Sequence, residues 1–245
     1  MKLRMLALYP EQMNIYADRG NIVFLQRRCE WRGIDFDLAA AGPGQGFDPD
    51  AHDLIYIGGG QDRDQKLVAE DMLETKRDAI AAAVESDAVV LAVCGGYQLL
   101  GHSYQLASER IAGLGLVDLE TVREPGARLI GNVAIEAEIG TGSPELIAGF
   151  ENHGGRTHLG PTATPLGRVI KGHGNNGRDG YEGVRHRNLF GTYLHGPLLP
   201  KNAVLADRLI QLALARRQGT EPTLAGLDDA FEQAAHRSAR AAAGA

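Results

Sequence analysis

The sequence predicts an α/β protein built on a doubly wound, mostly parallel sheet to which antiparallel strands are appended. Two patterns support this fold class. Up to Gly101, short apolar runs of strand length alternate with longer stretches of helical spacing. After Gly101, short β-rich pieces are separated by recurring glycines, which is typical of antiparallel strands.

The elements can be placed in chain order from their apolar spacing and turn residues. In the first half the predicted strands are Leu3 to Tyr9, Ile34 to Ala39, Asp53 to Ile57 and Ala88 to Val93. The predicted helices are Ile22 to about Arg32, after a turn at Asp18 to Asn21, then Leu67 to Glu85 and Asn202 to Arg217. The predicted later strands are Ile130 to Ile139, Val169 to Lys171, Gly183 to His186 and Leu189 to Leu194.

No internal repeat or linker divides the chain, so we expect one domain over residues 1–245. Its core is expected at about residues 2–217. The Ala-rich tail, residues 227–245, is expected to be helical at first and to fray after Ala234.

Composition excludes several classes of protein. A net charge of -6 without a Lys and Arg cluster argues against nucleic-acid binding. The two cysteines, Cys29 and Cys94, provide neither a disulfide framework nor a Cys-based zinc site. The first residues are too polar for a signal peptide and no apolar run approaches membrane-spanning length, so we expect a cytoplasmic protein.

The most informative stretch surrounds Cys94, which ends an apolar run and precedes two glycines and the apolar segment Tyr97 to Leu100. Strand, sharp turn and helix form the layout of a nucleophile elbow, and Ala92 and Gly96 leave room for a strained turn. A helix N-terminus favours thiolate, and the Gly95 N–H would face a developing oxyanion. A buried structural cysteine is the alternative, which the paired glycines disfavour.

A cysteine nucleophile needs a base, and the sequence contains eight histidines. His195 follows the apolar run Leu189 to Leu194, so it would face Cys94 if the two strands are neighbours, because carboxyl strand ends share one sheet edge. His153 is the competitor, within the polar, glycine-rich Gly149 to Thr157. A tight turn and a substrate-side role both stay open for it.

The glycine run after the third strand, Gly58 to Gly60, is the second informative loop. Glycines let backbone amides approach a ligand closely, so this loop is expected to supply a second oxyanion donor beside Gly95. No P-loop motif occurs, which argues against ATP binding by that route.

With these residues placed, the chain resembles the class I glutamine amidotransferases, and among them the cobyric acid synthase-like branch, which has an ending like Gly191 to Gly196. It is more closely similar to the GatD-type glutaminase subunits of lipid II isoglutaminyl synthase. The motifs that carry this resemblance are Met13 to Asn21, Val93 to Gln98, Gly149 to Thr157 and Thr192 to Asn202. The implied fold is the flavodoxin-like class I amidotransferase fold.

The resemblance implies that Cys94 is the nucleophile, His195 the base and Arg128 the residue that holds glutamine. A guanidinium suits this role because it grips an α-carboxylate with two hydrogen bonds. From the sequence alone Arg123 and Arg156 are equal candidates. The residues implied to form the substrate site are Arg128, Gly95, Gly59 and Gly60. No metal or cofactor is implied in this chain.

The resemblance also implies a partner, because ammonia is useful only if it is delivered directly. By this resemblance the partner is expected to be a MurT-like Mur ligase subunit. It would use ATP and Mg²⁺ to amidate the D-glutamate of lipid II, bringing the heterodimer to the inner face of the membrane. Pro197 departs from the many class I members that have a glutamate two residues after the histidine. Either a Cys–His dyad suffices, or a carboxylate from elsewhere, such as the partner subunit, completes the site.

Three alternatives remain open at this point. The chain could be a glutaminase for another acceptor, such as a cobyrinic acid. It could be a non-catalytic regulatory subunit with the same fold, since Pro197 removes the usual acid. It could also be an unrelated cysteine hydrolase, which the match at Gly191 to Gly196 disfavours.

Overall fold

The structure is a computed structural model that describes residues 1–14, 19–60, 62–105 and 109–245, with the backbone alone for 62–64. Part of the predicted turn before the first helix, at Asp18, therefore lies outside the described residues. A six-stranded sheet forms the centre, in the order β13-β14-β4-β3-β1-β2. Its strands are β1 (Lys2–Leu8), β2 (Asp35–Ala41), β3 (Leu54–Ile57), β4 (Val89–Val93), β13 (Val184–His186) and β14 (Leu189–Thr192).

All neighbouring strands of this sheet are parallel except the edge pair β13 and β14. Without that edge strand the order is that of flavodoxin-like sheets, so the predicted fold class is confirmed. Every residue of β3, β4 and β14 is buried, which explains why these strands are continuous apolar runs.

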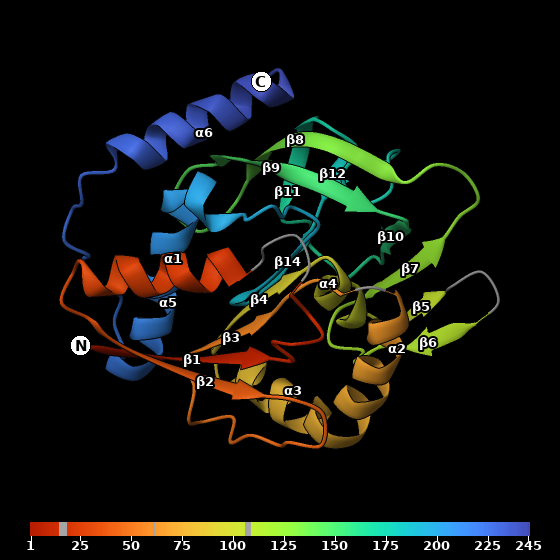
Figure 1. Ribbon diagram of the computed structural model, residues 1–245, viewed down its shortest axis with the longest axis horizontal. Helices are drawn as coiled ribbons and strands as arrows, with labels where there is room; N and C mark the ends of the chain where they lie inside the picture. The colour runs from red at the N-terminus through yellow and green to blue at the C-terminus, as the bar shows by residue number, and fades with distance from the viewer. Residues whose placement is uncertain (15–18, 61, 106–108) are drawn as a thin grey trace.

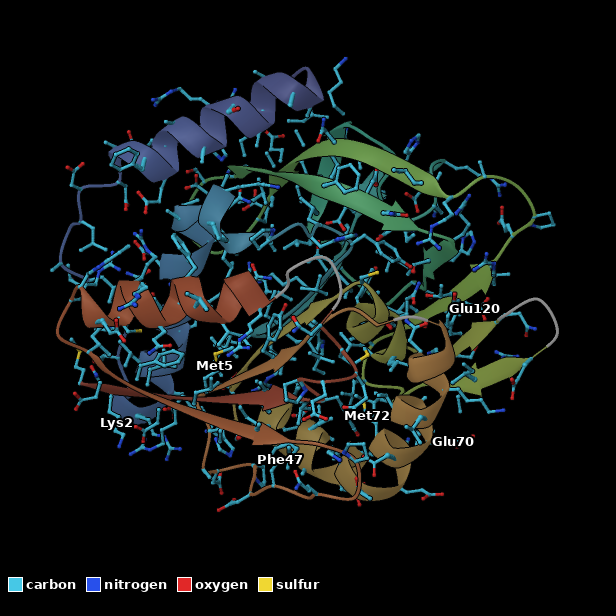
Figure 2. The ribbon with its side chains drawn as sticks, viewed as in Figure 1. Lys2, Met5, Phe47, Glu70, Met72 and Glu120 are labelled. Atoms are coloured by element: carbon cyan, nitrogen blue, oxygen red, sulfur yellow. The ribbon has the colours of Figure 1, made fainter. Side chains whose placement is uncertain are left out.

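Helices cover both faces of the sheet, with α1 and α5 on one face and α3 on the other (Figure 1). The helical segments are α1 (Arg19–Glu30), α2 (Asp62–Asp71), the π-helical η2 (Met72–Lys76), α3 (Arg77–Glu85), α4 (Gly95–Leu99), the 3₁₀ turn η3 (Leu199–Lys201), α5 (Ala203–Gln218) and α6 (Ala230–Ala243). Met5 and Met72 are buried in the core, whereas Lys2 and Glu70 lie at the surface (Figure 2).

Of the later strands predicted to be appended to the main sheet, Gly183 to His186 and Leu189 to Leu194 do join it, as β13 and β14, whereas Ile130 to Ile139 and Val169 to Lys171 do not. The strands outside the main sheet form two further four-stranded sheets, β10-β7-β5-β6 and β12-β11-β8-β9. Their strands are β5 (Ser103–Gln105), β6 (Arg110–Ala112), β7 (Leu119–Arg123), β8 (Leu129–Ala137), β9 (Glu145–His153), β10 (Gly155–Leu159), β11 (Gly167–Lys171) and β12 (Tyr181–Glu182). Several are too short or too glycine-interrupted for their sequence pattern to reveal them.

The C-terminal tail corrects a second expectation, since the helix does not fray after Ala234 but continues to Ala243. Tertiary contacts explain the difference. The fully buried Arg28 of α1 forms ion pairs with Asp207 of α5 at 2.6 Å and with Asp229, just before α6, at 2.7 Å. These contacts hold the start of the tail against the body of the protein. Among the described residues, no helix is both long and apolar enough to cross a bilayer.

Candidate active site

Cys94 lies at the corner between β4 and α4, as the elbow pattern predicts. Its backbone has a φ of 51°, in the left-handed region that side chains other than glycine rarely adopt. The Cys94 N–H donates to the Thr192 carbonyl at 2.8 Å, which ties the corner to β14. Such a strained residue at a strand end is typical of a functional site.

The glycines after Cys94 are required by close packing against the Gly58 loop. A Cβ atom on Gly95 would overlap the Gln65 amide and stand 3.1 Å from the Gly60 nitrogen. A Cβ atom on Gly96 would stand 2.9 Å from the Gly58 oxygen, which instead accepts the Gly96 N–H at 3.1 Å. The two backbone segments expected to supply oxyanion donors are therefore neighbours.

His195 reaches the same sheet edge as Cys94, because β14 pairs in parallel with β4 and Thr192 is opposite Val93. The His195 N–H donates to the Phe150 carbonyl at 2.9 Å, and its ring lies edge-on to the Phe150 ring. Its side chain is fully buried. The condition on which the sequence argument depended, adjacent strands for the two residues, is met.

Burial lowers the pKa of His195 from 6.5 to about 4. The charges of His153, Lys201 and Arg128 act in the same direction. The imidazole is therefore neutral near pH 7, which is the protonation state that accepts a proton from a thiol.

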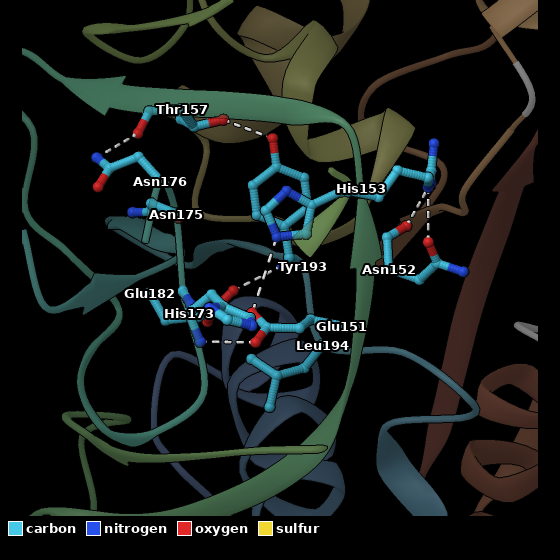
Figure 3. A network of polar contacts seen from close by, with 12 residues as sticks. Glu151, Asn152, His153, Thr157, His173, Asn175, Asn176, Glu182, Tyr193 and Leu194 are labelled. Carbon is cyan, nitrogen blue, oxygen red and sulfur yellow. Dashed lines mark hydrogen bonds and ion pairs between the residues drawn. The ribbon is translucent and has the colours of Figure 1, made fainter. Parts of the chain in front are cut away.

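The His153 side chain is fixed by contacts with neighbouring residues of the protein. Its ring stacks on the Tyr193 ring (Figure 3), with centroids 3.6 Å apart. Its Nδ1 lies 2.8 Å from the Gly155 carbonyl oxygen. Its Nε2 lies 3.8 Å from a carboxylate oxygen of Glu151. Because the side chain is 1% exposed, the structure favours a supporting role over direct contact with a substrate.

The three candidate arginines differ in their surroundings. Arg156 is buried, and its guanidinium donates to the carbonyls of Gly154 and Ala127, at 3.1 and 2.8 Å. It therefore stabilises the local backbone. Arg128 is exposed, and its Nε and Nη2 donate to the side-chain and main-chain oxygens of Asn152, both at 2.7 Å. Arg123 Nη1 and Arg128 Nη1 both lie within 3.5 Å of the point a Gly154 Cβ would occupy, so these two guanidinium groups stay candidates.

Sequence reasoning missed the buried carboxyl group that holds the strand before His195. Glu182 of β12 accepts the Tyr193 N–H at 2.6 Å and the Thr192 hydroxyl at 3.0 Å. Burial raises the pKa of Glu182 to about 8. Its position on a two-residue strand left no pattern by which it could be found.

Comparison with known protein families agrees with an amidotransferase-type site at this sheet edge. Residues 4–203 match the family model described as a CobB/CobQ-like glutamine amidotransferase domain. This chain belongs to that family.

Members of the family with curated names include two that are similar over most of their length. The lipid II isoglutaminyl synthase (glutamine-hydrolyzing) subunit GatD of Streptococcus pneumoniae is 40% identical, over 95% of this chain and 88% of that protein. GatD of Staphylococcus aureus is 39% identical, over 84% and 82%. A cobyric acid synthase from Pelotomaculum thermopropionicum is 34% identical over 78% of this chain but only 39% of its own length.

Solved structures show the same fold at low identity. The PurLQS structure from Thermotoga maritima matches with a TM-score of 0.56 at 20% identity, over 87% of this chain and 98% of that one. A glutamine amidotransferase from the same organism matches with a TM-score of 0.53 at 16% identity, over 99% and 94%.

Pro197, at the position where the acid of many class I amidotransferases is expected, packs against α1 in this family member. A Cβ atom on Gly20 would stand 2.9 Å from the Pro197 ring. Within the described part of the chain, the charged groups that shift the His195 pKa are all basic.

Proposed function

We propose that this chain is the glutaminase subunit of a lipid II isoglutaminyl synthase. The observation that carries the proposal is the convergence of Cys94 and His195 at the ends of two adjacent parallel strands. This chain matches GatD subunits of lipid II isoglutaminyl synthase over most of both lengths, and this similarity supports lipid II as the acceptor of the ammonia. The chain would hydrolyse glutamine and pass ammonia to an ATP-dependent ligase.

The reaction begins with attack of the Cys94 sulfur on the side-chain amide carbon of glutamine, while the thiol proton passes to neutral His195. The N–H of Gly95 and a second N–H from Gly59 or Gly60 stabilise the oxyanion. The imidazolium then protonates the leaving nitrogen, which departs as ammonia and leaves a thioester. His195 next deprotonates a water molecule that hydrolyses the thioester and releases glutamate.

Arg128 would hold the α-carboxylate of glutamine. Its guanidinium is anchored on Asn152 through two donor atoms and still presents Nη1, so it is oriented before the substrate arrives. Its charge also acts on His195, which is consistent with a position at the same site.

The ligase partner would be a MurT-like subunit that supplies ATP and Mg²⁺ chemistry and activates the D-glutamate carboxylate of lipid II. Such a complex would work in the cytoplasm at the inner membrane face. A cobyrinic acid is the second candidate acceptor, because cobyric acid synthases are relatives. Similarity favours the first, since a GatD subunit is 40% identical over 95% of this chain, whereas a cobyric acid synthase is 34% identical over 78% of it.

The test is to purify the chain with a co-expressed Mur-ligase-like subunit and measure lipid II amidation from glutamine and from ammonium salts. Wild type should use both nitrogen sources. Cys94→Ala should lose the glutamine-driven reaction and keep the ammonium-driven one, and Cys29→Ala should keep both. Glutamine-driven turnover by Cys94→Ala would refute the mechanism, and a stable complex with a corrin-modifying synthetase instead would refute the acceptor.

A further inference from the structure

We propose that Lys201 is a positioning residue for His195, and that the C-terminal helix α6 holds Lys201 in place through His236. This inference rests on the proposed glutaminase function and deepens it. It assigns a role in the reaction to a helix that follows residue 203, where the match to the family model ends.

The contact with the His195 corner is direct. Lys201 ends η3, and its ammonium donates to the Gly196 carbonyl at 2.7 Å. Gly196 follows His195 and has a φ of 82°, so the chain turns sharply there. A hydrogen bond from a charged donor is stronger than a neutral one, so the ammonium fixes the carbonyl next to the base.

Lys201 also acts on His195 by its charge. Besides burial, the charges of His153 from β9, Arg128 just before β8 and Lys201 from η3 lower the pKa of His195. Lys201 is half-buried, and its ammonium is therefore less screened by water than a surface charge. The same side chain thus orients the corner and disfavours protonation of the base.

Helix α6 holds the other end of this residue. The His236 ring nitrogen Nδ1 lies 2.8 Å from the Lys201 carbonyl oxygen. Farther along α6, the Ala242 carbonyl accepts a hydrogen bond from the Asn132 amide of β8 at 3.1 Å. Together with the Arg28 pair to Asp229, these contacts fix the helix at its start, middle and end. Figure 1 shows α6 lying beside β8 and β9.

The first test compares Lys201→Met with Lys201→Arg in the assembled complex, using glutaminase kcat, KM and the pH profile. Lys201→Met should lower kcat about tenfold, less than the roughly hundredfold cost of misplacing a catalytic group by about 1 Å. KM should stay within about twofold, because ground-state binding is unchanged. The acid limb of kcat/KM should move to higher pH, and Lys201→Arg should restore most of both properties.

Wild-type kcat and an unchanged acid limb in Lys201→Met would overturn the inference, as would equal impairment in Lys201→Arg. A wild-type complex without any glutaminase activity would instead refute the proposed function, so the two failures are distinguishable.

The second test addresses α6 and decides the matter if Lys201→Met does not fold. His236→Ala should lower kcat in the same sense as Lys201→Met, whereas Ser238→Ala, at an exposed position on the same helix, should not. The thermal unfolding midpoint of each variant shows whether the fold is intact. Full activity in His236→Ala, or equal loss in Ser238→Ala, would contradict the role of the helix.

Discussion

The two corners that carry the reactive side chains are held in different ways. At the Cys94 corner, the chain passes from β4 directly into α4, and its two glycines pack closely against the Gly58 loop and the Gln65 amide. At the His195 corner, side chains from distant parts of the sequence hold the loop. Asn21 of α1 accepts the Leu199 N–H at 2.8 Å, across 178 residues of sequence.

Asn202 makes the contrast clearer. Its fully buried side chain accepts the Ala148 N–H at 2.9 Å and donates to the carbonyls of Ala148 and Leu198, both at 2.8 Å. The nucleophile is thus positioned mainly by its strand–turn–helix backbone, with neighbouring backbone groups, whereas the base is positioned by side chains from distant elements. The base should therefore be the more sensitive of the two to substitutions far from the site.

The largest expected effect removes the nucleophile itself. Cys94→Ala should lower glutaminase activity at least about a thousandfold, as loss of a catalytic nucleophile does in other hydrolases. Cys29→Ala is the matched control, because burial raises the pKa of the Cys29 thiol to about 12 and keeps it unreactive. Steady-state glutamate release measures both. Equal losses in the two variants would mean that Cys94 has no special role.

The pH dependence of stability tests the His195 corner. Because the folded-state pKa of about 4 lies below the ordinary 6.5, the unfolded chain binds the proton more readily. The contribution of His195 is therefore complete above pH 6.5 and is lost as the pH falls towards 4, by about 3 kcal/mol. Denaturant unfolding of wild type and His195→Gln across this range measures it. Parallel pH profiles for the two proteins would contradict the buried neutral imidazole.

Asn202→Ala separates the two corners. It removes the side-chain hydrogen bonds to the Ala148 N–H and to the Ala148 and Leu198 carbonyls, so it should cost about 2 kcal/mol of unfolding free energy. Because His195 would be less well positioned, kcat for glutamine hydrolysis should fall, while the Cys94 corner keeps its structure. Urea unfolding and the kcat/KM split give the two readouts. An unchanged unfolding free energy would show that the His195 corner does not depend on this side chain.

The smallest expected effect concerns substrate binding. Arg128→Lys keeps the charge but loses the planar group anchored on Asn152, so KM for glutamine should rise about tenfold with kcat little changed. Arg156→Lys is the comparison, since its guanidinium serves backbone carbonyls and should affect stability instead. A KM rise for Arg156→Lys alone would reverse the assignment.

The same contrast explains what the sequence could predict. The Cys94 corner is formed by consecutive residues. The run Ala88 to Gly101 therefore predicts its strand, its elbow and its glycines. The supports of His195, such as Glu182 and Asn202, could not be predicted, because they come from separate elements. The persistence of α6 to Ala243 was missed for the same reason, since it depends on tertiary contacts rather than on local propensity.

The most direct test of the central claim is covalent labelling by an electrophilic diazoketone analogue of glutamine, located by peptide mass spectrometry in the assembled complex. The account predicts one adduct, on the peptide that contains Cys94, protected by glutamine and formed much more slowly in His195→Ala. No adduct on Cys94, or labelling of Cys29 at an equal rate, would contradict it.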